Sequence, residues 1–164
     1  MGRVYLIGVD HAIQHNGFVV GQGDEVVVDP QKVAAAIRDL QEYLRQQVEV
    51  TRATVLAEEF SKDALAKNRA TMSSVAQVAQ DLGIKHLFCD PGEAERERLG
   101  IDTCDKRENH WAARLAPFMG EDILFVCGDK HVATFPEVLK RHGMNSCVLS
   151  QGRGRDLIPM CFGG

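Results

Sequence analysis

The sequence lacks any long run of charge of one sign, and it contains few aromatic residues. Among its 164 residues, 19 Lys and Arg face 23 Asp and Glu, which gives a net charge of −4, and 6% are aromatic. A general electrostatic grip on nucleic acid or on an anionic membrane needs clustered positive charge, so neither partner is expected. Acidic and basic residues instead alternate along helical stretches, which is typical of solvated helix faces.

Paired cysteine motifs are also absent. The five cysteines include no C-x-x-C pair, and two of them lie within apolar, strand-like runs. An odd count with this spacing argues against a disulfide framework or a zinc knuckle. It predicts reduced thiols, most of them buried.

Long hydrophobic runs are missing as well. No window approaches the roughly 20 apolar residues that span a membrane, and the first apolar run, at residues 4–7, is too short for a signal peptide. A compact domain of this length can bury a substantial core without disulfides or metals. We therefore expect one cytoplasmic domain over residues 1–164, with a tail from about residue 151.

Short apolar runs alternate with amphipathic stretches about five times. The strand-like runs lie at residues 4–7, 54–57, 84–89, 123–127 and 147–149. The stretches with helical spacing or polarity lie at residues 30–48, 61–69, 72–82, 93–98, 105–119 and 133–142. This alternation predicts a three-layer α/β fold, in which a mostly parallel sheet of about five strands has helices on both faces. Residues 11–30 read as a long loop.

Several predicted helices carry residues that favour their ends. Asp29 and Ser61 stand where they could cap helices, and Pro30 suits a first helical turn. Gly83 is a typical terminating residue. The chain from 123 to 127 is continuously apolar, as expected for a strand that is buried on both faces.

Two segments with the pattern glycine–x–x–histidine follow strand-like runs, Gly8 to His11 and Gly128 to His131. Ligand sites in open parallel sheets lie outside the carboxyl ends of the strands. A glycine directly after a strand lets the backbone turn sharply and leaves room for a ligand near the main chain. We therefore predict that His11 and His131 form the centre of a site, and that the two glycines contribute to binding a cofactor.

Carboxylates follow the same strands. Glu58 and Glu59 point to opposite faces of a strand, so one is expected in the site, and we favour Glu58. Asp10 and Asp129 stand beside the histidines and could bind a cofactor or serve as turn residues. Two imidazoles with a carboxylate are a common ligand set for a divalent metal, although the same groups could act without metal as general acid and base. The candidate metal ligands are His11, Glu58, Glu59 and His131.

Arg107 lies one helical turn before Trp111 on a predicted helix. If the helix begins near residue 105, Arg107 stands close to its amino end. There it could reach the strand ends and hold a carboxylate or a developing anion. The alternative is an arginine in a solvated first turn.

Four short blocks resemble a known superfamily, which joins the erythromycin-esterase-like, haem-binding ChaN-like, TraB/GumN and Tiki proteins. The blocks cover residues 6–11, 55–59, 107–112 and 123–132, in the order found in the family. The resemblance implies a parallel α/β core with paired histidines and acids in a cleft. Its members include metal-dependent proteases, esterases that act on a macrolide, and haem binders. Carried onto this sequence, the resemblance points to His11, Glu58 or Glu59, Arg107 and His131.

This chain is shorter than typical members of the superfamily, and it has little room between residues 60 and 105 for their helical lid. We predict a metal-assisted hydrolase of an ester, amide or similar acyl bond in a small molecule or peptide. Manganese, cobalt or zinc would be the metal, and Arg107 would stabilise the oxyanion. The alternative is a non-catalytic module that binds a small anionic ligand or haem.

A third hypothesis makes Cys89 a nucleophile beside Asp90, although buried structural cysteine is far commoner. The C-terminal tail is partly apolar. It could join two subunits in a homodimer or cover an edge of the sheet.

Overall fold

The computed structural model of the chain describes residues 1–10, 13 and 29–153. Five strands form one parallel sheet in the order β3-β2-β4-β1-β5. The strands are β1 (Arg3–Val9), β2 (Val55–Glu58), β3 (Lys85–Phe88), β4 (Ile123–Gly128) and β5 (Asn145–Arg153). The three-layer α/β fold predicted from the sequence is confirmed.

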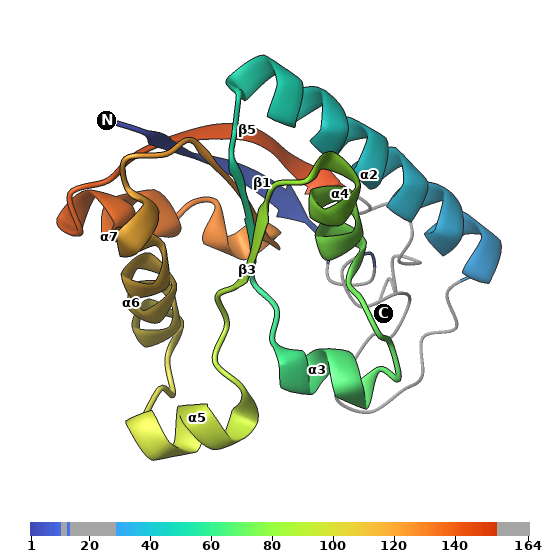
Figure 1. Ribbon diagram of the computed structural model, residues 1–164. Helices are drawn as coiled ribbons and strands as arrows, with labels where there is room; N and C mark the ends of the chain where they lie inside the picture. Colours follow the sequence, from blue (N-terminus) through green and yellow to red (C-terminus); the bar gives the residue numbers. More distant parts are fainter. Residues whose placement is uncertain (11–12, 14–28, 154–164) are drawn as a thin grey trace, which may run out of the picture.

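Helices cover both faces of this sheet (Figure 1). Helices α2 (Pro30–Thr51) and α4 (Ser74–Leu82) lie on one face, and α6 (Cys104–Leu115) and α7 (Phe135–Arg141) lie on the other. Strand β4 is buried along its whole length because apolar side chains pack against it from both layers. No helix in the described part of the chain is both long enough and apolar enough to cross a membrane.

Local signals in the sequence determine several helix ends. The side chain of Asp29 accepts a hydrogen bond from the first turn of α2 at 2.9 Å, and Pro30 occupies that turn. Ser61 caps the short helix α3 (Lys62–Lys67) in the same way. Gly83 ends α4 with a φ of +67°, a conformation that glycine adopts without strain. The predicted surface helix near residue 93 is α5 (Glu93–Leu99).

Most elements differ from their predicted limits by a few residues, and two of the differences have a clear physical cause. The helix expected over 105–119 ends at Leu115 and continues as the 3₁₀ helix η1 (Ala116–Phe118), because Pro117 has no N–H to donate to an α-helical turn. The last strand runs to Arg153 rather than Leu149, since β5 follows β1 through two shifts in register. The start of the predicted tail therefore belongs to the sheet, and residues 154–164 lie outside the described part.

The chain leaves the neighbouring strands β1 and β4 toward opposite faces of the sheet. These strands are neighbours, and Val9 pairs with Gly128 at their carboxyl ends. After β1 the chain continues to α2 on one face, whereas after β4 it continues to α7 on the other. Ligands in parallel α/β proteins bind at the strand ends where neighbouring connections part in this way.

Candidate functional site

Charged side chains from four separate segments meet at the carboxyl ends of β2, β3 and β4. Glu59 directly follows β2, Asp90 follows β3, and His131 ends the 3₁₀ helix η2 (Asp129–His131) that follows β4. Arg107 comes from the first half of α6. The exposed fractions of these side chains are 3% for Glu59, 7% for Asp90, 1% for His131 and 17% for Arg107. Together with Glu108, these residues are called the carboxyl-edge cluster below.

Arg107 is held between two carboxylates. Its Nη2 donates to Oε1 of Glu59 at 2.7 Å, and its Nε and Nη2 donate to Oδ1 of Asp90 at 3.0 and 2.9 Å. Burial disfavours the charge on Arg107, but Asp90 and then Glu59 outweigh burial and raise its pKa. The guanidinium therefore remains a cation in a fixed place, and it is not the solvated side chain of the alternative prediction.

His131 is fixed by Glu108. Its Nδ1 lies 2.6 Å from Oε1 of Glu108, which also accepts a hydrogen bond from Oγ1 of Thr134 at 2.5 Å. Because a carboxylate oxygen can only accept, we assign the proton to Nδ1. Nε2 makes no hydrogen bond within the described residues and lies 3.4 Å from Oε1 of Glu59, longer than an ordinary N–H···O bond.

The two carboxylates also affect the ionisation of His131. Burial alone would favour the neutral imidazole. The nearness of Glu59, followed by that of Glu108, outweighs burial and raises the pKa of His131 above its ordinary value. The cluster therefore favours a positive charge at this imidazole.

Glu59, rather than Glu58, lies beside Arg107 and His131. Oε2 of Glu59 accepts a hydrogen bond from the backbone N–H of Gly128 at 2.7 Å, and Oε1 faces the other two side chains. The sequence predicts one glutamate in the site because neighbouring side chains alternate between faces. It favours Glu58, whereas the structure brings Glu59 to this place.

Glu58 lies on the other side of the sheet and is completely buried. Its Oε1 accepts a hydrogen bond from Oγ of Ser73, the N-cap of α4, and lies 2.8 Å from Nε2 of His86. Within the described part of the chain, its Oε2 makes no hydrogen bond. Any role for Glu58 would therefore involve residues other than those of the carboxyl-edge cluster.

Gly8 and Asp129 have definite packing roles. A Cβ added at Gly8 would come within 2.5 Å of Oδ1 of Asp129 and 2.7 Å of Cγ2 of Val132. The same Oδ1 accepts a hydrogen bond from the backbone N–H of Gly152 at 2.6 Å, which joins η2 to β5. Gly8 thus allows η2 to approach β1 closely, and the predicted cofactor contacts of Gly8 and Asp129 stay a prediction.

His11, the predicted partner of His131, lies outside the described residues. Its neighbour Asp10 is described, and the backbone N–H of Asp10 donates to the carbonyl of Arg153 at 2.7 Å. Asp10 leaves β1 beside the start of η2, since Val9 pairs with Gly128. The pairing of the two histidines and the contribution of Asp10 to a site stay predictions.

Neither Asp90 nor Glu108 was among the predicted site residues. Glu108 lies three residues before the buried Trp111, a spacing that places both on one helix face, and it is only 1% exposed. That spacing was a usable signal. Trp111 also takes part in the site, because its Nε1 donates to Oδ1 of Asp90 at 3.0 Å and its ring centroid lies 4.7 Å from that of His131.

Cys89 is a buried structural thiol. Burial is the main cause that raises its pKa, to about 12, and the nearby Arg114 offsets this only in part. A thiol with such a pKa stays protonated at neutral pH, and a protonated thiol is a weak nucleophile. The structure therefore favours the buried-thiol interpretation over a Cys89 nucleophile.

The donors at the carboxyl edge fit part of a metal site. Within the described residues, no group of three or more His, Cys, Asp or Glu side chains is arranged to hold a metal. Two suitable donors are present, however, because the 3.4 Å between Nε2 of His131 and Oε1 of Glu59 matches the edge of a tetrahedral zinc shell, about 3.4 Å. A cation there would also satisfy the buried Nε2.

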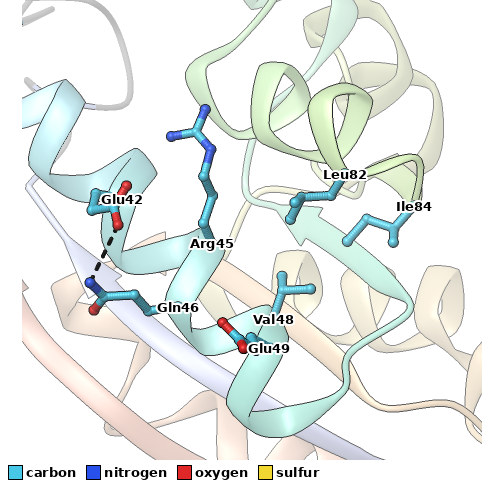
Figure 2. Close-up of a pocket in the computed structure, with 7 residues that line it drawn as sticks. All are labelled: Glu42, Arg45, Gln46, Val48, Glu49, Leu82 and Ile84. Carbon is cyan, nitrogen blue, oxygen red and sulfur yellow. Dashed lines mark hydrogen bonds between the residues drawn. The ribbon is translucent and has the colours of Figure 1, made fainter.

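A separate hollow lies near the opposite edge of the sheet (Figure 2). Its volume is about 410 Å³, and it lies between the C-terminal half of α2 and the end of α4. It is lined by Glu42, Arg45, Gln46, Val48, Glu49, Leu82 and Ile84. None of these is a predicted site residue, and Ile84 directly precedes β3, at the amino ends of the strands. We therefore assign the candidate site to the carboxyl-edge cluster.

The chain matches no protein-family model, and neither a curated protein nor a solved structure matches it. The resemblance to the erythromycin-esterase, ChaN, TraB and Tiki superfamily therefore rests on the four short sequence blocks. Three of those blocks contribute Glu59, Arg107 and His131, and the structure brings these side chains together.

Proposed function

We propose that the protein is a metal-assisted hydrolase of an ester, amide or similar acyl bond, with its centre at Glu59 and His131. The observation that carries this proposal is the buried Nε2 of His131, which has no hydrogen bond among the described residues and lies near a carboxylate oxygen. With Nδ1 donating to Glu108, a neutral imidazole directs a lone pair toward Glu59. These two groups repel each other unless a proton or a cation lies between them.

In this proposal Glu59 and His131 hold a divalent cation, and Glu108 fixes the tautomer and orientation of the imidazole. A bound cation would lower the pKa of a water ligand and polarise the acyl oxygen. His11 stays a candidate for a further ligand on sequence grounds. Manganese, cobalt and zinc are the ions to test.

Arg107 would stabilise negative charge on the substrate oxygen. Its Nε and Nη2 are bound to Asp90 and Glu59, and Nη1, which makes no hydrogen bond to the described residues, is the donor that we assign to a substrate. A guanidinium held in place before the reaction needs no reorganisation as charge develops, which is the main advantage of such a donor.

The test is a screen of ester and peptide substrates with each of the three ions, on wild type, His131→Gln and His110→Gln. His110 lies on α6 but belongs to no contact of the cluster, so His110→Gln is the matched control. We expect turnover that needs the ion, falls by at least about a hundredfold in His131→Gln, and is unchanged in His110→Gln.

Equal turnover in the two variants, or none with any ion, would contradict the proposed function. A Soret band after addition of haemin, lost in His131→Gln, would instead favour the haem-binding alternative.

A further inference from the structure

Asp90 binds four donors, and it directly follows the strand-like run at residues 84–89. Its Oδ1 accepts hydrogen bonds from Nε and Nη2 of Arg107 and from Nε1 of Trp111, and its Oδ2 accepts one from Nη2 of Arg96. Arg96 comes from α5 and is 38% exposed. This arrangement fixes a nearly buried carboxylate in one orientation.

Arg107 is shared unequally between its two carboxylates. Of its three hydrogen bonds to described residues, two go to the same oxygen of Asp90, and the third, the shortest at 2.7 Å, goes to Glu59. A guanidinium can bind one carboxylate through two parallel bonds, and this arrangement is preferred where the geometry allows it. Without Asp90, Glu59 is the carboxylate that Arg107 could bind in this way.

We infer that Asp90 is a positioning residue, which limits Arg107 to one hydrogen bond with Glu59 and so keeps Oε1 of Glu59 directed at Nε2 of His131. Glu59 is also tied by its second oxygen, Oε2, to the backbone N–H of Gly128. The position of Glu59 is therefore set by Gly128 on one side and by the shared Arg107 on the other. The inference rests on the proposed function only where it concerns the cation.

The first test uses the cation-free protein, so it does not depend on the proposed function. The Gly128 amide donates to Oε2 of Glu59, and its NMR resonance therefore reports a movement of this carboxylate. We expect Asp90→Asn to shift that resonance. Asp102→Asn is the matched control, because Asp102 is 73% exposed and pairs only with Lys106 among the described residues.

A Gly128 resonance that stays in place in folded Asp90→Asn would overturn the inference, whatever the cation does. If Asp90→Asn fails to fold, Arg96→Gln removes a partner of Asp90 from the surface, with Arg98→Gln on the same helix as its control. A Gly128 resonance that shifts in Arg96→Gln but not in Arg98→Gln supports the inference. The same Gly128 resonance in both variants overturns it.

The second test is a zinc titration by calorimetry on wild type, Asp90→Asn, Asp102→Asn and the double variant Asp90→Asn/Arg107→Gln. In Asp90→Asn, Arg107 can form a second hydrogen bond to Glu59 and then competes more strongly with the cation, so we expect the affinity to fall by about tenfold, a typical loss for residues behind a metal ligand. Removing Arg107 as well takes away the competitor, and the double variant should regain most of the affinity.

If Asp90 has a merely structural role, the double variant should not regain affinity. It should bind zinc as weakly as Asp90→Asn or more weakly. That result would overturn the inference. If the wild type binds no zinc, manganese or cobalt, the proposed function fails, and the Gly128 resonance alone decides whether Asp90 positions Glu59.

Discussion

Single residues at the carboxyl edge show how a buried ionic group is held in place. Glu108 is almost completely buried, and its Oε1 accepts hydrogen bonds from Nδ1 of His131 and from Oγ1 of Thr134. A buried carboxylate without such donors would lose the solvation that water provides. The same bonds fix the ring of His131, so its other nitrogen has one direction in which to act.

The ionisation of His131 should make the stability of the cation-free protein depend on pH. Its pKa in the folded state is raised above the ordinary value of 6.5. The folded state therefore binds this proton more tightly than the unfolded state does, and the resulting stability is complete below pH 6.5. It is lost as the pH rises through the raised value of the folded state.

We expect the free energy of unfolding, measured by urea denaturation with chelator present, to fall between pH 6 and pH 9 in wild type and in His110→Gln. The fall should be smaller in His131→Gln, which has no imidazole at this position. The same fall in all three proteins would show that other groups cause it.

At the level of elements, η2 must approach β1 closely for the cluster to form. A Cβ at Gly8 would collide with Asp129, the first residue of η2, and with Val132, which directly follows η2. Since η2 ends with His131, a displacement of η2 would move the imidazole as well.

We expect Gly8→Ala to lower the free energy of unfolding by about 1–3 kcal/mol, as overpacking does in a tight contact. Gly120→Ala is the control, because a Cβ at Gly120 meets nothing within 4 Å, and its effect should stay within about 0.5 kcal/mol. Urea denaturation of both variants measures the difference. Equal free energies of unfolding for Gly8→Ala and Gly120→Ala would mean that η2 can move away from β1 without loss of stability.

The elements also show what the sequence could predict and where it could not. Asp29, Ser61 and Gly83 mark helix ends through local hydrogen bonds and backbone conformation, and these were predicted. The extent of β5 was not, because its last residues belong to the sheet only through shifted pairing with β1. Long-range pairing of this kind leaves no local pattern.

The same distinction applies to the site. His131 was proposed because strand ends meet at one edge of a parallel sheet, and Arg107 because it stands near the start of a helix, one turn before Trp111. The alternation of side chains shows that Glu58 and Glu59 diverge, but only the order of the strands and the face occupied by α6 show that Glu59 joins Arg107. Asp90 follows a predicted strand, but its four donors come from α5 and α6, and the position of these helices over the strand end could not be predicted from the sequence.

At the scale of the whole molecule, one sheet separates two polar centres that have related chemistry. Glu59 and His131 face the layer of α6 and α7, and Glu58 and His86 face the layer of α2 and α4. Nε2 of His86 lies 2.8 Å from Oε1 of Glu58, whereas Nε2 of His131 lies 3.4 Å from Oε1 of Glu59. This contrast supplies a control with the same residue types.

The most direct test of the proposed cation centre is the metal content of protein purified without chelator or affinity metal, measured by mass spectrometry. We expect close to one equivalent of manganese, cobalt or zinc in wild type and in folded Glu58→Gln/His86→Gln, and none in folded Glu59→Gln/His131→Gln. Metal that stays in the Glu59→Gln/His131→Gln variant, or that is absent from wild type even after each ion is added, would contradict the proposed cation centre.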